Sequence, residues 1–233
     1  MVFLDLSALP SDYNIELKVL VCQLSSEASR RGLSMQIAES ESDAVAPFPV
    51  RKFSKPEYQL LGKLGVLSVD DRVELLEGWI VPKMNHNPPH DLALMLVEEK
   101  LRCCLPSNML LRIQMPISTV DSEPEPDLAI VLGPIRRYSK RHPEPDDVLL
   151  VIEVADTSLA RDRQKCRLYA RGNMREYWIV NLVERQIEVH CQPSGPTLAP
   201  TYRIRDVYDE SCTISFATDG AAAFPIQVRD LLP

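Results

Sequence analysis

The chain has 233 residues, of which 45% are hydrophobic and 25% are charged. Such a chain is long enough for one substantial core and a small appendage, and its composition is typical of soluble globular proteins. It contains no apolar run of about eighteen residues, which excludes a membrane-spanning helix. Its N-terminal residues lack the basic and apolar regions of a secretory signal, so we expect a cytoplasmic protein.

The formal net charge of −7 is spread unevenly along the sequence. A negative protein is a poor candidate for coating nucleic acid nonspecifically, because phosphate binding depends on basic side chains. Residues 161–175, however, hold six basic residues and only one acidic residue. A basic face of this kind can guide a nucleic acid to an enzyme even when the average charge is negative.

The six cysteines and four histidines do not have the spacing of a zinc site. No CxxC pair occurs, and the neighbouring Cys103 and Cys104 end a helical pattern. We therefore expect reduced thiols that fill small apolar spaces.

Residues 1–50 differ from the rest of the chain in both pattern and charge. They hold seven acidic and three basic residues. Apolar residues recur at helical spacing: Leu17, Leu20, Val21, Leu24 and Ala28. The acidic, proline-bearing segment 39–50 is typical of a linker. We predict an N-terminal extension with one amphipathic helix over residues 1–50, and a main domain over residues 51–233.

Two helices and a hairpin are predicted at the start of the main domain. The first helix begins after Ser54, a favourable N-cap residue that is followed by proline and glutamate. Two short apolar runs on either side of Glu77-Gly78 predict a β-hairpin over residues 72–84. Apolar residues at helical spacing predict the second helix, over residues 90–104.

Strands and one further helix follow along the chain. We predict strands over residues 109–118, 126–132, 148–155, 176–181 and 185–191, a helix over 158–173, and a strand or two with a short helical end over 201–233. The segment 148–155 is apolar except for Glu153, as expected for a central strand covered on both faces. Alternating strands and helices predict an α/β fold with a mixed β-sheet.

Two carboxylates and a lysine occupy positions where charge is unusual. Glu153 interrupts an apolar strand, and Asp127 opens a strand that looks parallel. A buried charge is costly unless it is paired or binds a metal ion. Two such acids can share Mg²⁺, which orients water for attack on a phosphodiester, and Lys165 can stabilise the phosphate or help to deprotonate the water. The residues alone leave another interpretation open, in which Asp127 caps a turn, Glu153 pairs with an arginine and Lys165 is solvated.

Longer segments around these residues resemble one protein family. The segments are RVELLEGWIVPKMNHNPPHDLAL, SEPEPDLAIV, YSKRHPEPDDVLLVIEVADTSLARD and KCRLYARGNMREYWIVN. They are similar to the Uma-type family of predicted restriction endonucleases, within the PD-(D/E)XK nuclease superfamily, over residues 51–195. The resemblance implies a restriction-endonuclease-like fold, in which helices flank a mixed β-sheet, and divalent-metal-dependent cleavage of phosphodiesters. It also implies a site made of Asp127, Glu153 and a lysine on the next helix.

The sequence departs from the superfamily's pattern in two places. The superfamily's lysine stands two residues after the strand carboxylate, where this chain has Ala155; Lys165 takes its place, as in the Uma-type family. Only one residue separates the Asp162-Arg163 pair from Lys165, one fewer than in similar sequences. Since Lys165 keeps its helical spacing to the residues after it, we place the shortening in the loop before it. If Lys165 faced away, Arg161 or Arg163 would supply the cation.

Other residues extend or flank this set. The superfamily often adds an early glutamate to the metal site, and Glu74 fits that role, although an outward-facing strand residue is an equal alternative. His90 is either a half-buried histidine at a helix start or a neighbour of the site. Asp156, with Thr157 and Ser158, is expected to cap the basic helix. Three aromatic residues are expected to pack in the core: Tyr169, Tyr177 and Trp178.

Two functions from different classes follow. The first is a Mg²⁺- or Mn²⁺-dependent endonuclease that acts on DNA, and double-strand cleavage would suggest a homodimer. Its catalytic residues would be Lys165, Glu153, Asp127, Glu74 and His90, and the three carboxylates would bind the metal. The second is a nuclease-fold protein with a decayed site that binds partners. The enzyme requires that the functional atoms converge within a few ångströms of one point.

Overall fold

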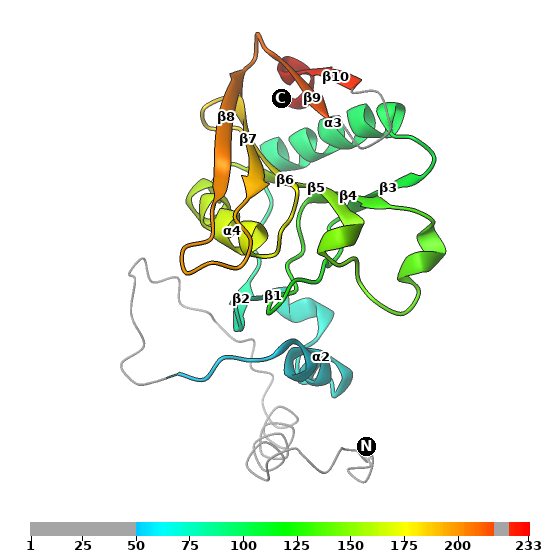
Figure 1. The fold of residues 1–233 in the computed structure, drawn as a ribbon, viewed down its shortest axis with the longest axis vertical. Helices are drawn as coiled ribbons and strands as arrows, with labels where there is room; N and C mark the ends of the chain where they lie inside the picture. The colour runs from blue at the N-terminus through cyan, green and yellow to red at the C-terminus, as the bar shows by residue number, and fades with distance from the viewer. Residues whose placement is uncertain (1–49, 217–223) are drawn as a thin grey trace. The chain divides into compact units, whose positions relative to one another are not determined.

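The computed structural model describes residues 50–216 and 224–233 (Figure 1). The amphipathic helix predicted within residues 1–50 lies outside these ranges. Among the helices described, none combines the length and the hydropathy that crossing a bilayer requires. Most of the predicted main domain falls within the described ranges.

The described residues belong to two compact units. Pro56–Asp71 is part of the first unit, and the second consists of Lys52–Lys55 and Arg72–Pro233. Helix α2 (Lys55–Lys63) begins directly after Ser54, as predicted. Every candidate site residue lies in the second unit.

A six-stranded sheet forms the centre of the second unit (Figure 1). Its strands lie side by side in the order β3-β4-β5-β6-β7-β8. They span Met109–Ile113, Leu128–Leu132, Val148–Ala155, Glu176–Asn181, Gln186–Pro193 and Tyr202–Asp209. Strands β5 and β6 pair in parallel, and the other neighbours in this sheet are antiparallel. The predicted mixed sheet is therefore confirmed.

The strand that follows Asp127 is antiparallel to both of its neighbours, so the expectation of a parallel strand was wrong. Residues 128–131 of β4 are buried, and Leu132 is partly buried. A strand covered on both faces is apolar along its whole length, whichever direction it runs. The unbroken apolar run therefore reports burial on two faces and not strand direction.

Helix α4 (Leu159–Arg171) covers one face of the sheet. It connects β5 to β6, because parallel neighbours cannot be joined by a tight turn and need a crossover. It ends at Arg171, and Gly172 is its C-cap, as predicted. Its residues Leu168 and Tyr169 share a buried core with Ile179 of the sheet.

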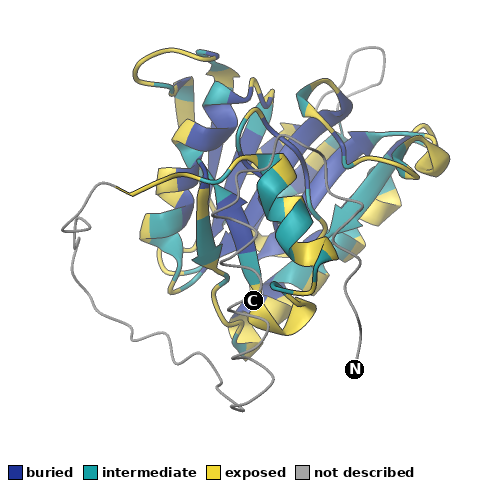
Figure 2. Ribbon diagram, turned by 90° about the horizontal axis from the view of Figure 1, so that it is seen from below, coloured by how far each residue is buried: buried dark blue, intermediate teal, exposed yellow. Residues whose placement is uncertain are grey.

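Helix α3 (Pro88–Cys104) covers the other face, where Val97 and Leu101 pack against β4 and β5 residues such as Ile152. It begins two residues before the predicted start, because prolines are tolerated in a first helical turn. The side chain of Asn87 caps it by accepting a hydrogen bond from the His90 backbone. In Figure 2 the strands between the two helical layers are the dark blue, buried part of the unit.

The predicted hairpin is present as β1 (Val73–Leu76) paired with β2 (Trp79–Pro82). The two turn residues, Glu77 and Gly78, have φ angles of 51° and 83°. A two-residue hairpin turn of this kind needs left-handed backbone at both positions, which explains the glycine. A second antiparallel pair and the short helices complete the described fold: β9 (Thr213–Phe216), β10 (Phe224–Gln227), η2 (Val69–Asp71), η3 (Ile135–Tyr138), η4 (Pro145–Asp147) and η5 (Val228–Leu231).

The five cysteines in the described ranges are free thiols, as predicted. Cys103 is exposed, so it does not fill an apolar space. The other four are partly buried.

Candidate active site

Glu153 lies on the face of the sheet that α4 covers. Its neighbours Ile152 and Val154 point into the core on the α3 side, since successive side chains of a strand alternate between faces. The Glu153 side chain is only 5% exposed. Leu128 pairs with Ile152, so Asp127 lies beside Glu153 at the start of the neighbouring strand.

Three polar residues of α4 face the same side. Asp162, Lys165 and Tyr169 follow helical spacing, which places them on one face of the helix, and all three are buried. Because α4 begins at Leu159, the short link from Asp162 to Lys165 is helical. The expectation that the shortening lies in a loop was therefore wrong, and so was the alternative of a solvated Lys165.

The ammonium group of Lys165 is the centre of this cluster. Its Nζ donates a hydrogen bond of 2.9 Å to Oε1 of Glu153. Carboxylate oxygens of Glu74 and Asp162 lie 3.6 Å and 3.8 Å from the same nitrogen. The Tyr169 hydroxyl donates a second hydrogen bond, of 2.8 Å, to Oε1 of Glu153. One buried lysine therefore meets three carboxylates.

Asp127 is held in place from three directions. The backbone N–H of Val154 donates to Oδ2 of Asp127 over 2.8 Å. The backbone N–H of Asp127 lies 3.4 Å from Oε2 of Glu153. The Nε2 atom of His90 lies 3.2 Å from Oδ2 of Asp127. Asp127 thus joins the lysine cluster to the start of helix α3.

Glu74 points inward and is buried, so the alternative of an outward-facing residue was wrong. Its Oε1 accepts a hydrogen bond of 3.0 Å from Arg161, besides lying near Lys165. Its Oε2 accepts a hydrogen bond of 3.1 Å from the Glu125 backbone. Both oxygens of Glu74 therefore already have protein partners.

The surplus of acids shifts the protonation of the cluster. Burial and, to a smaller extent, the charges of Asp162, Asp127 and Glu74 raise the pKa of Glu153 to about 8 against the attraction of Lys165. Burial alone would lower the pKa of Lys165, but attraction to the carboxylates outweighs burial and raises it. Lys165 therefore stays charged while Glu153 resists ionisation.

Asp127 and His90 shift each other's pKa in opposite directions. Burial favours the neutral form of Asp127, but hydrogen bonding and attraction to His90 outweigh it and lower the pKa of Asp127. Burial also favours neutral His90, but hydrogen bonding and attraction to Asp127 outweigh it and raise the pKa of His90. The pair thus favours a carboxylate beside an imidazolium.

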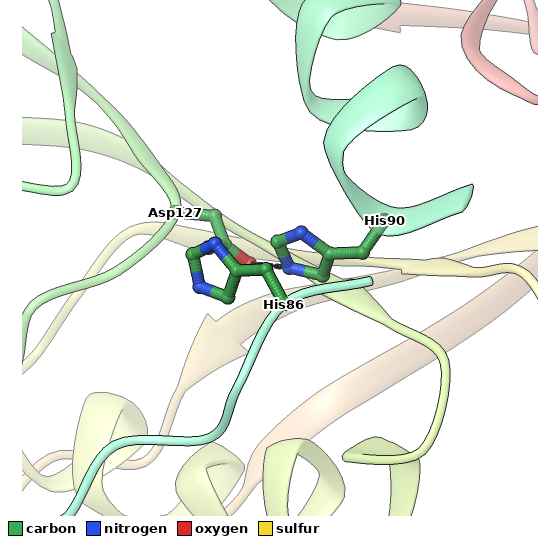
Figure 3. A group of neighbouring side chains, drawn as sticks. All are labelled: His86, His90 and Asp127. Carbon is green, nitrogen blue, oxygen red and sulfur yellow. Dashed lines mark hydrogen bonds and ion pairs between the residues drawn. The ribbon is translucent and has the colours of Figure 1, made fainter. Parts of the chain in front are cut away.

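A group of potential metal ligands is formed by His86, His90 and Asp127 (Figure 3). One ligand atom from each of them lies within 4.8 Å of the others. The two imidazole rings stack with their centroids 4.3 Å apart. Among the described residues, His86, His90 and Asp127 form the group whose potential ligand atoms lie this close together. Neither Glu153 nor Glu74 belongs to this group.

A family model described as "Uma2: Putative restriction endonuclease" matches residues 57–217. The chain belongs to the Uma2 family. A solved structure described as "a putative nuclease belonging to DUF820", from Anabaena variabilis ATCC 29413, has a similar fold, with a TM-score of 0.55 and 15% sequence identity. That similarity covers 76% of this chain and 95% of the other. None of the curated proteins compared with the chain matches it. The family resemblance and the restriction-endonuclease-like fold are thus confirmed.

The Uma2 chain does not present the open basic face that the charge of residues 161–175 suggested. All four arginines on α4 are paired with acids: Arg161 with Glu74, Arg163 with Glu188, Arg167 with Glu77, and Arg171 with Glu77 and Asp121. Their charge is largely offset within the protein. Arg163 binds Glu188 and not Glu153, and the cation beside Glu153 is Lys165.

Sequence patterns missed three neighbours of the predicted site. Tyr169 packs in the core as predicted, but its hydroxyl also reaches Glu153. The sequence pattern marks Asp162 only as an acid in a basic segment, next to Arg163, and gives no sign of its position beside Lys165. His86 escaped attention, although the four-residue spacing to His90 could have revealed a histidine pair.

The predicted cap of α4 is confirmed in its position at Ser158 but not in its hydrogen bonding. Ser158 occupies the N-cap position, but its side chain makes no capping hydrogen bond. Its hydroxyl instead donates to Asp162 over 2.5 Å. Asp156 accepts a hydrogen bond of 2.6 Å from Asn87, so it supports the start of α3 and not that of α4.

Proposed function

We propose that this Uma2 protein is an endonuclease that hydrolyses phosphodiester bonds in DNA with the help of Mg²⁺ or Mn²⁺. The observation that carries the proposal is the excess of buried carboxylates around Lys165. A buried pair of opposite charges can be balanced, but additional acids leave uncompensated negative charge. A divalent cation bound among these acids would offset their negative charge. The same cation could also neutralise the charge of a phosphodiester substrate.

Asp127 and Glu153 provide the oxygen donors that Mg²⁺ prefers. Asp127 lies at the start of β4, and Glu153 lies near the end of the adjacent strand β5. Glu74 is a third oxygen donor nearby, and we assign it an assisting role because Arg161 and Lys165 already hold one of its oxygens. A bound divalent ion would activate water and neutralise charge on the phosphate.

The raised pKa of Lys165 favours one of its two candidate roles. A lysine that stays protonated is a poor proton acceptor for water, since a general base works best with a pKa near the working pH. The same ammonium group is well suited to holding a phosphate oxygen. We therefore assign Lys165 to stabilising the phosphate, and His90 to orienting Asp127 through their hydrogen bond.

Cleavage of a supercoiled plasmid tests the proposal. We expect nicking or linearisation that needs Mg²⁺ or Mn²⁺ and stops with a chelator. Asp127→Ala and Glu153→Ala should abolish it, whereas Asp206→Ala, at an exposed acid of β8, should cleave like wild type. Linear product without a nicked precursor would indicate two sites acting together in a dimer.

Two results would overturn the proposal. Cleavage that survives in Asp127→Ala would show that the activity belongs to another protein in the preparation. Absence of cleavage by the wild type, with both metals and with duplex and single-stranded DNA, would favour a decayed site in a binding protein. Cleavage of single-stranded RNA in preference to DNA would correct the substrate.

A further inference from the structure

A second set of donor atoms meets at Asp127, and two of its members are nitrogens. His90 comes from the first turn of α3, His86 from the segment before it, and Asp127 from the start of β4 (Figure 3). The shortest separation, between Nε2 of His90 and Oδ2 of Asp127, is 3.2 Å. The two histidines are not among the residues that surround Lys165.

The separation of His90 and Asp127 matches that of two ligands on one ion. Ligand atoms about 2.1 Å from a metal lie about 3.0–3.4 Å apart at octahedral or tetrahedral angles. All three ligand atoms lie within 4.8 Å of one another. His86 is exposed and precedes the helix, and its Nδ1 lies 3.3 Å from Nε2 of Gln114, so turning its ring toward the other two would change that surface contact and not the core.

The surroundings of His90 support a ligand role. Its Nδ1 is buried and makes no hydrogen bond within the described part of the chain. Oδ1 of Asp91 lies 3.7 Å from this nitrogen and 3.5 Å from Nδ1 of His86. Metal-bound histidines usually direct their second nitrogen to a carboxylate or carbonyl, which fixes the ring orientation. Asp91 is placed to do so for His90.

The segment that carries both histidines is fixed at one point. Asn87 accepts a hydrogen bond of 3.1 Å from the His90 backbone and donates one of 2.6 Å to Asp156, which follows β5. The start of α3 is thereby tied to the end of the central strand. Such support lowers the entropy lost when ligands are arranged around an ion.

We propose that His86, His90 and Asp127 bind a divalent transition-metal ion of the Mn²⁺, Co²⁺ or Zn²⁺ class. Imidazole nitrogen suits these ions, whereas Mg²⁺ and Ca²⁺ are held by oxygen. The position shares Asp127 with the oxygen donors around Glu153 and does not use Glu153 or Lys165. The meaning of this ion for catalysis rests on the proposed function, but its binding does not.

Co²⁺ titration of the full-length protein, prepared without a histidine tag, tests the inference. The titration is followed by visible absorption without added Mg²⁺, since Asp127 is shared with the proposed Mg²⁺ position. We expect one equivalent of Co²⁺ to bind in a way that depends on the histidines. His86→Ala and His90→Gln should each weaken binding more than about tenfold, since even an outer partner of a ligand is worth about 10–100-fold.

Two controls separate this position from other sites. His142→Ala removes a histidine outside the group and should bind Co²⁺ like wild type. Glu153→Gln should also retain the Co²⁺ affinity, because Glu153 is not one of the three ligands. Because His86 is exposed, its variant tests the inference even if His90→Gln fails to fold, and thermal unfolding identifies that case.

Wild-type affinity in His86→Ala would overturn the inference, and so would an equal loss of affinity in Glu153→Gln. The histidines would then serve only to orient Asp127. The outcomes for the two proposals remain distinct. Histidine-dependent Co²⁺ binding without any DNA cleavage rejects the nuclease alone, and Mg²⁺-dependent cleavage with histidine-independent Co²⁺ binding rejects this site alone.

Discussion

Two buried carboxylates, Glu153 and Glu188, each meet a basic residue of α4, yet their surroundings differ. Glu188, in β7, is bound by Arg163 on one side and by Arg205 at 3.1 Å on the other. Asn181 adds a hydrogen bond of 3.1 Å. Glu153 has one lysine, one hydroxyl and the backbone N–H of Asp127 as partners, and other carboxylates lie nearby.

The difference is visible in the pKa of each acid. Burial alone would raise the pKa of Glu188, but hydrogen bonds from Arg163, Asn181 and Arg205 outweigh burial and lower it. Burial raises the pKa of Glu153, and the attraction of Lys165 does not compensate. The same kind of residue, on neighbouring parts of one sheet, is therefore stabilised in opposite protonation states.

The ion pairs of Glu188 support the fold, whereas the ion pair of Glu153 and Lys165 has the charge imbalance expected of a ligand-binding site. Glu188 is fully paired, as expected for a buried charge that must not cost stability. The Glu153 cluster holds more negative charge than its lysine can balance, an arrangement that stability alone does not favour. Perturbed groups of this kind gather where a protein binds or transforms a charged ligand.

The largest expected effect follows from changing the Glu153 cluster. We expect Glu153→Gln and Lys165→Met each to lower the rate of plasmid cleavage on the order of a thousandfold, as when a group that acts on the transition state is lost. Urea unfolding of Glu153→Gln should show no loss of stability, because glutamine keeps the side-chain volume and cannot take on the buried charge that Glu153 gains as pH rises toward about 8. Full activity in both variants would show that Glu153 and Lys165 have no catalytic role. Glu153 and Glu188 would then differ in stability and pKa alone.

The next effect concerns Glu188 and falls on stability. Glu188→Ala should lower the free energy of unfolding by about 3 kcal/mol, since breaking a buried ion pair costs about 3–5 kcal/mol and both arginines are partly exposed. Glu184 touches Arg163 from the surface, so Glu184→Ala is a matched control with an expected loss under about 1 kcal/mol. Equal losses in the two variants would contradict a structural role for Glu188.

The two acids should also give stability opposite dependences on pH. The folded pKa of Glu188 is lowered, so its contribution is complete above its unfolded pKa of about 4.3 and is lost as pH falls through the folded value. The folded pKa of Glu153 is raised to about 8, so the folded state binds more protons and stability falls as pH rises from about 4.3 to about 8.

Urea unfolding across this range, with a chelator present, checks both signs. The deficit of Glu188→Ala relative to wild type should shrink in acid. The advantage of Glu153→Gln relative to wild type should grow toward pH 8. Parallel curves for wild type and Glu153→Gln would show that this acid is not destabilised in the fold.

The smallest effect is expected at Tyr169. Tyr169→Phe keeps the buried ring and removes the hydroxyl that donates to Glu153. Since a partner of a site residue is worth about 10–100-fold in comparable sites, we expect cleavage to fall about tenfold. The pH profile of cleavage should shift as well, because the hydroxyl favours the ionised carboxylate. A lower stability with an unchanged pH profile would assign Tyr169 to packing alone.

The elements of the second unit could be read from the sequence because their patterns are local. The apolar run of β5, the helical spacing of α3 and the Glu77-Gly78 turn each report on a few neighbouring residues. Glu153 and Lys165 could be linked as well, since a helix that follows a central strand packs back on the same sheet. The sequence pattern placed Glu153 and Lys165 near each other but did not determine which side chains they contact.

Long-range pairing decided the rest. The direction of β4 depends on partners that come from other parts of the chain, so an apolar run cannot reveal it. The arginines of α4 look free in the sequence because the acids that bind them lie far away along the chain. The same reason hid Glu188, whose alternating strand pattern gives no sign of two arginines.

The sequence by itself determined the α/β class, the central strand with its charged residue, and the lysine on the following helix, because periodicity and the cost of buried charge act locally. Only the tertiary structure decided which acids surround Lys165 and which histidines meet Asp127. These contacts join residues from separate elements, and their distances depend on strand register and helix phase together.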